Sequence, residues 1–187
     1  MATFDEFYSS LDSDRGIRGK EFEKFVKWFL KNDPVWASQV KDIWLWDEHP
    51  KRSEWGPDCG IDLVFESLLG DIWAVQAKCF APNLSINKED MNSFIAESAD
   101  DRFQRRLLIT STNRIGTNAD RVLDRKNVVR FLLEDFKNSA IIFPNSIENI
   151  YSGKKKDLKT PLPHQKEAIE KVFKELQYCN KGQIHMA

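Results

Sequence analysis

Three polar residues on two neighbouring apolar segments are placed where they could perform chemistry together. Gln76 and Lys78 interrupt the apolar run 71–80, and Asp62 lies in the apolar segment before it. Side chains alternate between the faces of a strand, so Gln76 and Lys78 share one face. Burying an amide and an ammonium in an apolar strand costs free energy unless they have partners. The pattern therefore indicates a functional site on this face.

The residue types suit metal-assisted hydrolysis of a phosphodiester. Mg²⁺ prefers oxygen ligands, which the Asp62 carboxylate, the Gln76 amide carbonyl and a backbone carbonyl can supply. A bound metal lowers the pKa of its water, and an ammonium such as that of Lys78 can orient the water and stabilise the developing anion. Each residue also has a structural explanation. Asp62 could cap a turn, Gln76 could satisfy a backbone group at a sheet edge, and Lys78 could extend to solvent.

The turn between the two segments decides whether these side chains meet. The sequence "SLLGD" predicts a three-residue hairpin loop, a type I turn followed by glycine in the left-handed region. Pairing Ser67 with Asp71 then sets Asp62 opposite Gln76, on the same face as Lys78. A two-residue loop would shift the register by one and turn Asp62 to the other face.

The surrounding segments alternate between strand and helix patterns. Thr3 and Glu6 form a capping box for a short first helix, and Thr117 is the predicted cap of the helix 117–125. Further helices are predicted over 19–32, 87–99 and 164–177, and strands over 40–48, 61–66, 71–80, 105–112 and 127–133. Strands that alternate with helices after an early hairpin predict an α/β fold with a mixed central β-sheet flanked by helices.

The helix predicted over 19–32 has one apolar stripe at helical spacing. Its lysines fall on the opposite side and form an ordinary solvated face. Glu21 and Glu23 both flank the stripe, so the helical pattern does not choose between them as a site residue. The stripe consists of Phe22, Phe25, Val26, Phe29 and Leu30.

The composition indicates a soluble globular protein. The chain has 187 residues, 41% of them hydrophobic, which suits one domain and the start of another. No apolar run approaches the ~20 residues of a membrane span, and the first residues lack the pattern of a signal peptide. The three cysteines form no CxxC pair, which argues against zinc. We expect a cytoplasmic protein without a membrane partner.

Basic residues gather in two segments although the net charge is −1. Residues 101–130 contain seven Arg and one Lys against three Asp, and 154–159 is lysine-rich. Such segments can meet a phosphate backbone, or can be solvated surface. The turn "TSTNRIGTN" could offer hydroxyls and helix N-terminal amides to a phosphate. We expect DNA contacts from Lys51, Arg52, Arg114 and Arg121.

Taken together, these motifs resemble the active site of PD-(D/E)xK nucleases, in the Mrr-like branch that has Gln in place of the usual acid. The resemblance covers roughly residues 15 to 135 and implies a restriction-endonuclease-like core. Besides the Asp and the Gln-x-Lys, it rests on an Asp-x-Gly-x-Asp pattern and on a preceding helix with Gly-x-x-Phe-Glu. The matching residues are Gly19, Phe22, Glu23, Asp58, Gly60, Asp62, Gln76 and Lys78.

The resemblance implies a role for each site residue. Asp62 would be the principal metal ligand, with Gln76 and the Ala77 backbone carbonyl completing the protein's share of the Mg²⁺ site. Lys78 would position the attacking water. Glu23 would hold the metal or a metal-bound water, and only the family pattern favours it over Glu21. Gln in place of an acid leaves one negative charge fewer, so metal affinity without DNA should be weak.

The C-terminal segment has its own resemblance. Residues 152–163 read as a linker, and "TPLPHQKEAIEKV" is similar to the entry segment of superfamily 2 helicase-like motors, in which Gln165 would read adenine. No phosphate loop follows, which suggests a truncated ATPase domain over 164–187. A Mrr-like nuclease joined to a motor is similar to the N-terminus of type ISP restriction-modification enzymes. The alternative is a C-terminal helix that packs on the first domain.

These observations predict a nuclease domain over 1–151 with double-stranded DNA as substrate. We expect a Mg²⁺-dependent endodeoxyribonuclease of type II-like or type I-like restriction enzymes. The type ISP resemblance further implies covalently attached helicase-like, methyltransferase and target-recognition domains, with ATP and S-adenosylmethionine as cofactors of the full-length bacterial enzyme. The alternative function is a catalytically silent DNA-binding or docking module with the same fold.

Overall fold

The computed structural model describes residues 2–57, 60–152 and 163–175. Asp58 of the predicted motif and most of the predicted linker lie outside the described residues. The chain divides into two compact units, Met1–Lys156 and Asp157–Ala187. None of the helices in the described ranges has the length and apolar character needed to cross a membrane.

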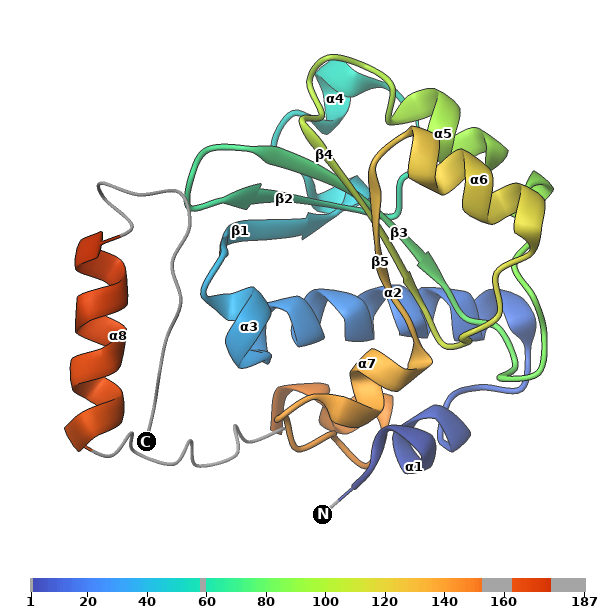
Figure 1. The fold of residues 1–187 in the computed structure, drawn as a ribbon. Coiled ribbons are helices and arrows are strands. Elements are labelled where there is room, and N and C mark those ends of the chain that lie inside the picture. The colour runs from blue at the N-terminus through green and yellow to red at the C-terminus, as the bar shows by residue number, and fades with distance from the viewer. Residues whose placement is uncertain (1, 58–59, 153–162, 176–187) are drawn as a thin grey trace. The chain divides into compact units, whose positions relative to one another are not determined.

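The first unit is built on one five-stranded sheet in which the strands lie in chain order (Figure 1). The first three strands pair antiparallel, and the third, fourth and fifth pair parallel. This arrangement confirms the predicted mixed sheet. The strands are β1 (Val40–Leu45), β2 (Leu63–Ser67), β3 (Ile72–Lys78), β4 (Arg105–Thr110) and β5 (Val128–Phe131).

Helices cover both faces of the sheet (Figure 1). One face carries α1 (Phe4–Ser9), α2 (Arg15–Asn32), α3 (Pro34–Ala37) and α7 (Leu133–Asn138), and the other carries α4 (Arg52–Trp55), α5 (Asn92–Glu97) and α6 (Thr117–Arg125). Short 3-10 helices are η1 (Trp46–Glu48), η2 (Glu89–Met91) and η3 (Ile147–Ser152), and the second unit contains α8 (Pro163–Glu175).

The two faces of the sheet bury two separate apolar cores. The predicted stripe of α2 is buried against the first face, where phenylalanine rings from α1, α2 and α7 pack together; the rings of Phe4 and Phe136 stack with centroids 4.4 Å apart. On β3, Val75 enters this first core and Ala74 enters the second. Gln76 and Lys78 therefore follow Ala74 onto the second face, beyond its apolar part.

The hairpin between β2 and β3 has the predicted register. The N–H of Gly70 donates to Ser67 O (3.0 Å), the N–H of Ser67 donates to Asp71 O (2.9 Å), and Gly70 has φ 88°. Leu63 pairs with Val75. Continuing this register by one residue sets Asp62 opposite Gln76, so the three-residue loop is confirmed.

One of the two predicted helix caps is confirmed. Thr3 and Glu6 form the capping box of α1. Thr117 is not a cap: it is the first residue of α6, and Gly116 occupies the cap position without a side-chain bond. The N–H of Gly116 donates to Ile86 O (2.9 Å), which holds Gly116 in an extended conformation, and the helix begins one residue earlier than it would with Thr117 as the cap.

The division into two units leads to a prediction about truncation. We expect a protein that ends at residue 152 to keep the first unit folded, because its sheet and both cores come from residues 2–152. Its Tm should differ from that of the 187-residue chain by less than about 3 °C, roughly the shift that 1 kcal/mol causes at this size. A much larger decrease in thermal unfolding experiments would show that the C-terminal residues stabilise the first unit.

Candidate active site

The structure brings together the residues predicted to form the site at the carboxyl end of β3. Lys78 is the last residue of β3 and pairs with Thr110 of β4. Gln76 is buried, with 4% of its surface exposed. Asp62 lies immediately before β2, and α2 packs against the sheet so that Glu23 reaches the same region. The residues come from three elements, which only the fold assembles.

The carboxylate of Asp62 is fixed to β3 by two hydrogen bonds. Its Oδ2 accepts from the backbone N–H of Ala77 (2.7 Å) and from Nε2 of Gln76. Both donors lie on the strand that also carries Lys78. The second oxygen, Oδ1, takes no part in these two bonds. The hairpin register therefore determines where the carboxylate is held.

The pKa of Asp62 is raised from its ordinary value of 3.8 to about 7, mainly by burial and also by the nearby charge of Glu23. The hydrogen bonds from Ala77 and Gln76 and the charge of Lys78 lower this pKa, but they do not outweigh burial. The site thus holds more negative charge than its surroundings stabilise. A divalent cation beside the two carboxylates would favour their ionised forms.

The donor set fits Mg²⁺ rather than a metal that prefers nitrogen or sulfur. Asp62 and Glu23 offer carboxylate oxygens, Gln76 an amide oxygen once its side chain turns, and Ala77 a backbone carbonyl. Within the described residues, no group of three or more His, Cys, Asp and Glu side chains converges on one point. Mg²⁺ tolerates such a sparse set because it keeps several of its waters.

Packing distinguishes the two glutamates of α2. Glu21 accepts a hydrogen bond from the backbone N–H of Asp12 (2.8 Å), which ties it to the turn before α2. Glu23 pairs with Lys20 (2.9 Å), is 12% exposed, and lies close enough to Asp62 to raise the pKa of that residue. The geometry favours Glu23, the residue that the family pattern indicated.

Gly60 allows the chain to approach α5 just before Asp62. Its φ of 122° is rarely adopted by residues with a side chain, and a Cβ at this position would lie 2.7 Å from Cβ of Ser93 and 3.1 Å from the backbone N of Phe94. A larger residue would push the chain away from α5 and move Asp62 with it. This contact gives a physical reason for the glycine of the motif.

The hydroxyls of Ser111 and Thr112 do not face a phosphate, contrary to the hypothesis for this turn. Both residues are completely buried. Oγ of Ser111 donates to Phe80 O (2.7 Å), and Oγ1 of Thr112 donates to Leu84 O (2.8 Å). These bonds join the loops that follow β3 and β4, so the hydroxyls stabilise the carboxyl edge of the sheet.

The residues expected to contact DNA differ in their surroundings. Lys51, Arg114 and Arg121 are exposed. Arg52 bonds Asp47 (Nε to Oδ1, 3.1 Å) and the carbonyl of Gly56, which reduces its availability. Several other arginines of the basic segment 101–130 form ion pairs with acidic neighbours, namely Arg102, Arg105 and Arg130. The exposed basic surface is therefore smaller than the residue count suggested.

The sequence did not reveal the residues that position the chain after Lys78. The hydroxyl of Tyr8 in α1 donates to Phe80 O (3.1 Å), and Oγ of Ser111 accepts from the N–H of Phe80 (2.8 Å). These partners are separated from Phe80 by 72 and 31 residues along the chain. No local pattern reports such contacts.

Comparisons with family models and with solved structures each found similar proteins. A family model described as restriction endonuclease matches residues 31–151. None of the curated proteins matches the sequence. Among solved structures, the ATP-dependent type ISP restriction-modification enzyme LlaBIII bound to DNA has a TM-score of 0.71 at 29% identity, covering 100% of this chain and 12% of that one. The modification-dependent restriction endonuclease AspBHI has a TM-score of 0.42 at 14% identity, covering 84% and 35%.

The raised pKa of Asp62 predicts that its charge destabilises the metal-free protein. The native state binds this proton more tightly than the unfolded chain, so the ionised carboxylate lowers stability as pH rises from about 4 to about 7. We expect Asp62→Asn, whose amide oxygen can accept the same bonds, to have a higher Tm than the wild type at about pH 8. The gain in the free energy of unfolding should be at most a few kcal/mol. The difference should disappear toward pH 4.

Mg²⁺ should reverse the order of the Tm values of the wild type and Asp62→Asn. Added Mg²⁺ raises the Tm of the wild type, because only the native state holds the site, and leaves Asp62→Asn unchanged. Asp101→Asn, at an exposed position, is the matched control and should behave as wild type in both buffers. A lower Tm for Asp62→Asn at pH 8 without metal would contradict the interpretation.

Proposed function

The chain belongs to the restriction endonuclease family whose model matches residues 31–151, and on that premise we propose that it is a Mg²⁺-dependent endonuclease module acting on double-stranded DNA. The observation that carries the proposal is the Asp62 carboxylate, bonded to Gln76 and Ala77 on the strand that ends at Lys78. A carboxylate, an amide and an ammonium on one face, with Glu23 nearby, suit phosphodiester hydrolysis.

Each residue has a role in this chemistry. Mg²⁺, held by Asp62, Gln76, the Ala77 carbonyl and Glu23, would supply an activated water and offset charge on the scissile phosphate. Lys78 donates a hydrogen bond that orients the attacking water oxygen toward phosphorus and stabilises the negative charge of the transition state. The two bonds to Asp62 keep its carboxylate in place while the substrate binds.

The similarity to LlaBIII supports a larger assembly. This chain spans 12% of LlaBIII, described as an ATP-dependent type ISP restriction-modification enzyme bound to DNA. We infer that the module is joined to helicase-like, methyltransferase and target-recognition domains, which would use ATP and S-adenosylmethionine in the bacterial cytoplasm. On this reading residues 164–187 begin the helicase-like domain, and Gln165 would read adenine.

Lys78→Ala tests the nuclease directly. We expect the wild-type chain to nick or cut plasmid DNA in Mg²⁺ or Mn²⁺, and Lys78→Ala to lose about a hundredfold or more in rate, because the water loses a preorganised donor. Lys24→Ala, an exposed lysine of α2, is the control and should cut at the wild-type rate. No cleavage in Mg²⁺ or Mn²⁺, or equal rates for the two variants, would favour the catalytically silent module.

The salt dependence of binding tests the basic surface. We expect Arg114→Glu and Arg121→Glu to weaken DNA binding and to reduce the slope of log K against log salt by roughly one per lost phosphate contact. Lys41→Glu, exposed on β1 near the turn of the β2–β3 hairpin and thus at the end of the sheet away from the site, is the control. An unchanged slope for both test variants would remove this region from the interface.

A further inference from the structure

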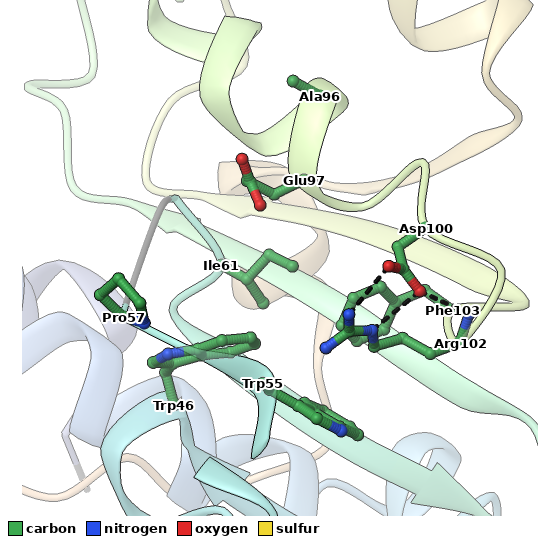
Figure 2. Close-up of a pocket in the computed structure, with 9 residues that line it drawn as sticks. All are labelled: Trp46, Trp55, Pro57, Ile61, Ala96, Glu97, Asp100, Arg102 and Phe103. Carbon is green, nitrogen blue, oxygen red and sulfur yellow. Dashed lines mark hydrogen bonds and ion pairs between the residues drawn. The ribbon is translucent and has the colours of Figure 1, made fainter. Parts of the chain in front are cut away.

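A pocket with aromatic walls lies on the second face of the sheet, and Ile61 in its wall is the residue before Asp62 (Figure 2). Its volume is about 350 Å³, and its walls come from η1, α4, α5 and the segment that leads into β4. This volume lies at the small end of the range for pockets that bind small molecules. The residues that form most of the wall are Trp46, Trp55, Ile61, Glu97, Arg102 and Phe103.

Aromatic rings and one guanidinium plane line this pocket, although Trp46 and Phe103 are buried and His49 stacks on one face of Trp55 with centroids 4.0 Å apart. The rings of Trp46 and Trp55 have centroids 5.9 Å apart, and those of Trp55 and Phe103 lie 5.6 Å apart at 83°. The guanidinium of Arg102 lies 5.1 Å from the centroid of Trp55. In Figure 2 the two tryptophans border one side of the cavity and Arg102 and Phe103 another.

The charged groups at the rim of the pocket comprise one ion pair and one further carboxylate. Arg102 is held by Asp100 through two bonds, each 2.8 Å long, so its charge is balanced. Glu97, exposed on α5, adds a carboxylate that can accept hydrogen bonds. The three charges sum to −1, which disfavours a phosphate inside the pocket. The lining suits a flat, uncharged ring that carries N–H donors.

The pocket is joined directly to the site residues. Ile61 precedes Asp62 in the chain, with consecutive Cα atoms about 3.8 Å apart. The backbone N–H of Trp46 donates to Asp62 O (2.9 Å). Two wall residues thus contact the residue that would hold the metal. A nucleotide whose phosphate lies at Asp62 would have its base within reach of this pocket.

We propose that this pocket binds one unpaired nucleobase of the DNA strand whose phosphate occupies the active site. The inference rests on the proposed nuclease function, because that function places DNA at Asp62. A base can stack on the Arg102 guanidinium beside the face of Trp55 that His49 leaves uncovered, and Glu97 accepts a hydrogen bond from the exocyclic amine of cytosine or adenine. The net charge of −1 also suits an ammonium ligand, but the connection of the pocket wall to Asp62 favours a base of the bound DNA.

The test compares two short duplexes in EDTA, which prevents cleavage. One contains 2-aminopurine opposite an abasic site, and the other contains it paired with thymine. We expect the wild-type chain to bind the unpaired form about fivefold to a hundredfold more tightly, as stacking of one base predicts, and to change its fluorescence on binding. Equal affinity for both duplexes overturns the proposal.

Variants of the wall assign the effect to the pocket. Trp55→Ala should abolish the preference and Trp55→Phe should restore part of it, because phenylalanine keeps a ring to stack on. Glu97→Ala, an exposed position that leaves packing intact, should weaken the preference severalfold. Asp101→Ala, exposed and outside the lining, is its matched control. A preference that persists in both Trp55→Ala and Glu97→Ala overturns the proposal.

Plasmid cleavage in Mg²⁺, measured in parallel on the same proteins, separates this inference from the proposed function. Cleavage without a preference for the unpaired base removes the pocket proposal and leaves the nuclease. A preference that depends on Trp55, without cleavage, keeps the pocket and removes the nuclease. Tighter binding of trimethyl-lysine than of deoxycytidine would identify a cation site and overturn the proposal.

Discussion

The hydrogen bond from the backbone N–H of Ala77 to the carboxylate of Asp62 connects the fold to the chemistry. It forms only when Asp62 faces Gln76 across the hairpin, so it depends on the three-residue loop and on Gly70 in its left-handed conformation. A shift by one residue would send the carboxylate into the first apolar core, where an unpaired charge is costly. The register of the hairpin therefore determines whether the candidate site forms.

The same contact explains why the surrounding structure is built as it is. The sheet divides its side chains between two cores, and the polar face of β3 begins where the second core ends. Helix α2 fills the first face and also brings Glu23 toward Asp62. Gly60 lets the preceding loop press against α5. The resulting burial raises the pKa of Asp62, because it disfavours the ionised carboxylate. A bound cation would stabilise this ionised form.

The loops at the carboxyl edge show how polar residues can support a site without entering it. Ser111 and Thr112 are of the type that binds phosphate, yet both hydroxyls bond backbone carbonyls of the loop after β3. Tyr8 bonds the same loop from α1. Buried hydroxyls must find partners, and the nearest acceptors here belong to the protein. These hydroxyls are therefore engaged within the protein, and the proposed DNA contacts involve exposed residues and the pocket next to Asp62.

The sequence by itself determined the mixed α/β sheet, the buried stripe of α2 and the hairpin register, because each follows from periodicity or from turn chemistry within a few residues. It also placed Asp62, Gln76 and Lys78 on one face. It could not choose between Glu21 and Glu23, could not tell that Ser111 is buried, and gave no sign of the pocket formed by Trp46, Trp55 and Phe103. Those features depend on contacts between distant segments, and only the tertiary structure decides which side chains such contacts bury.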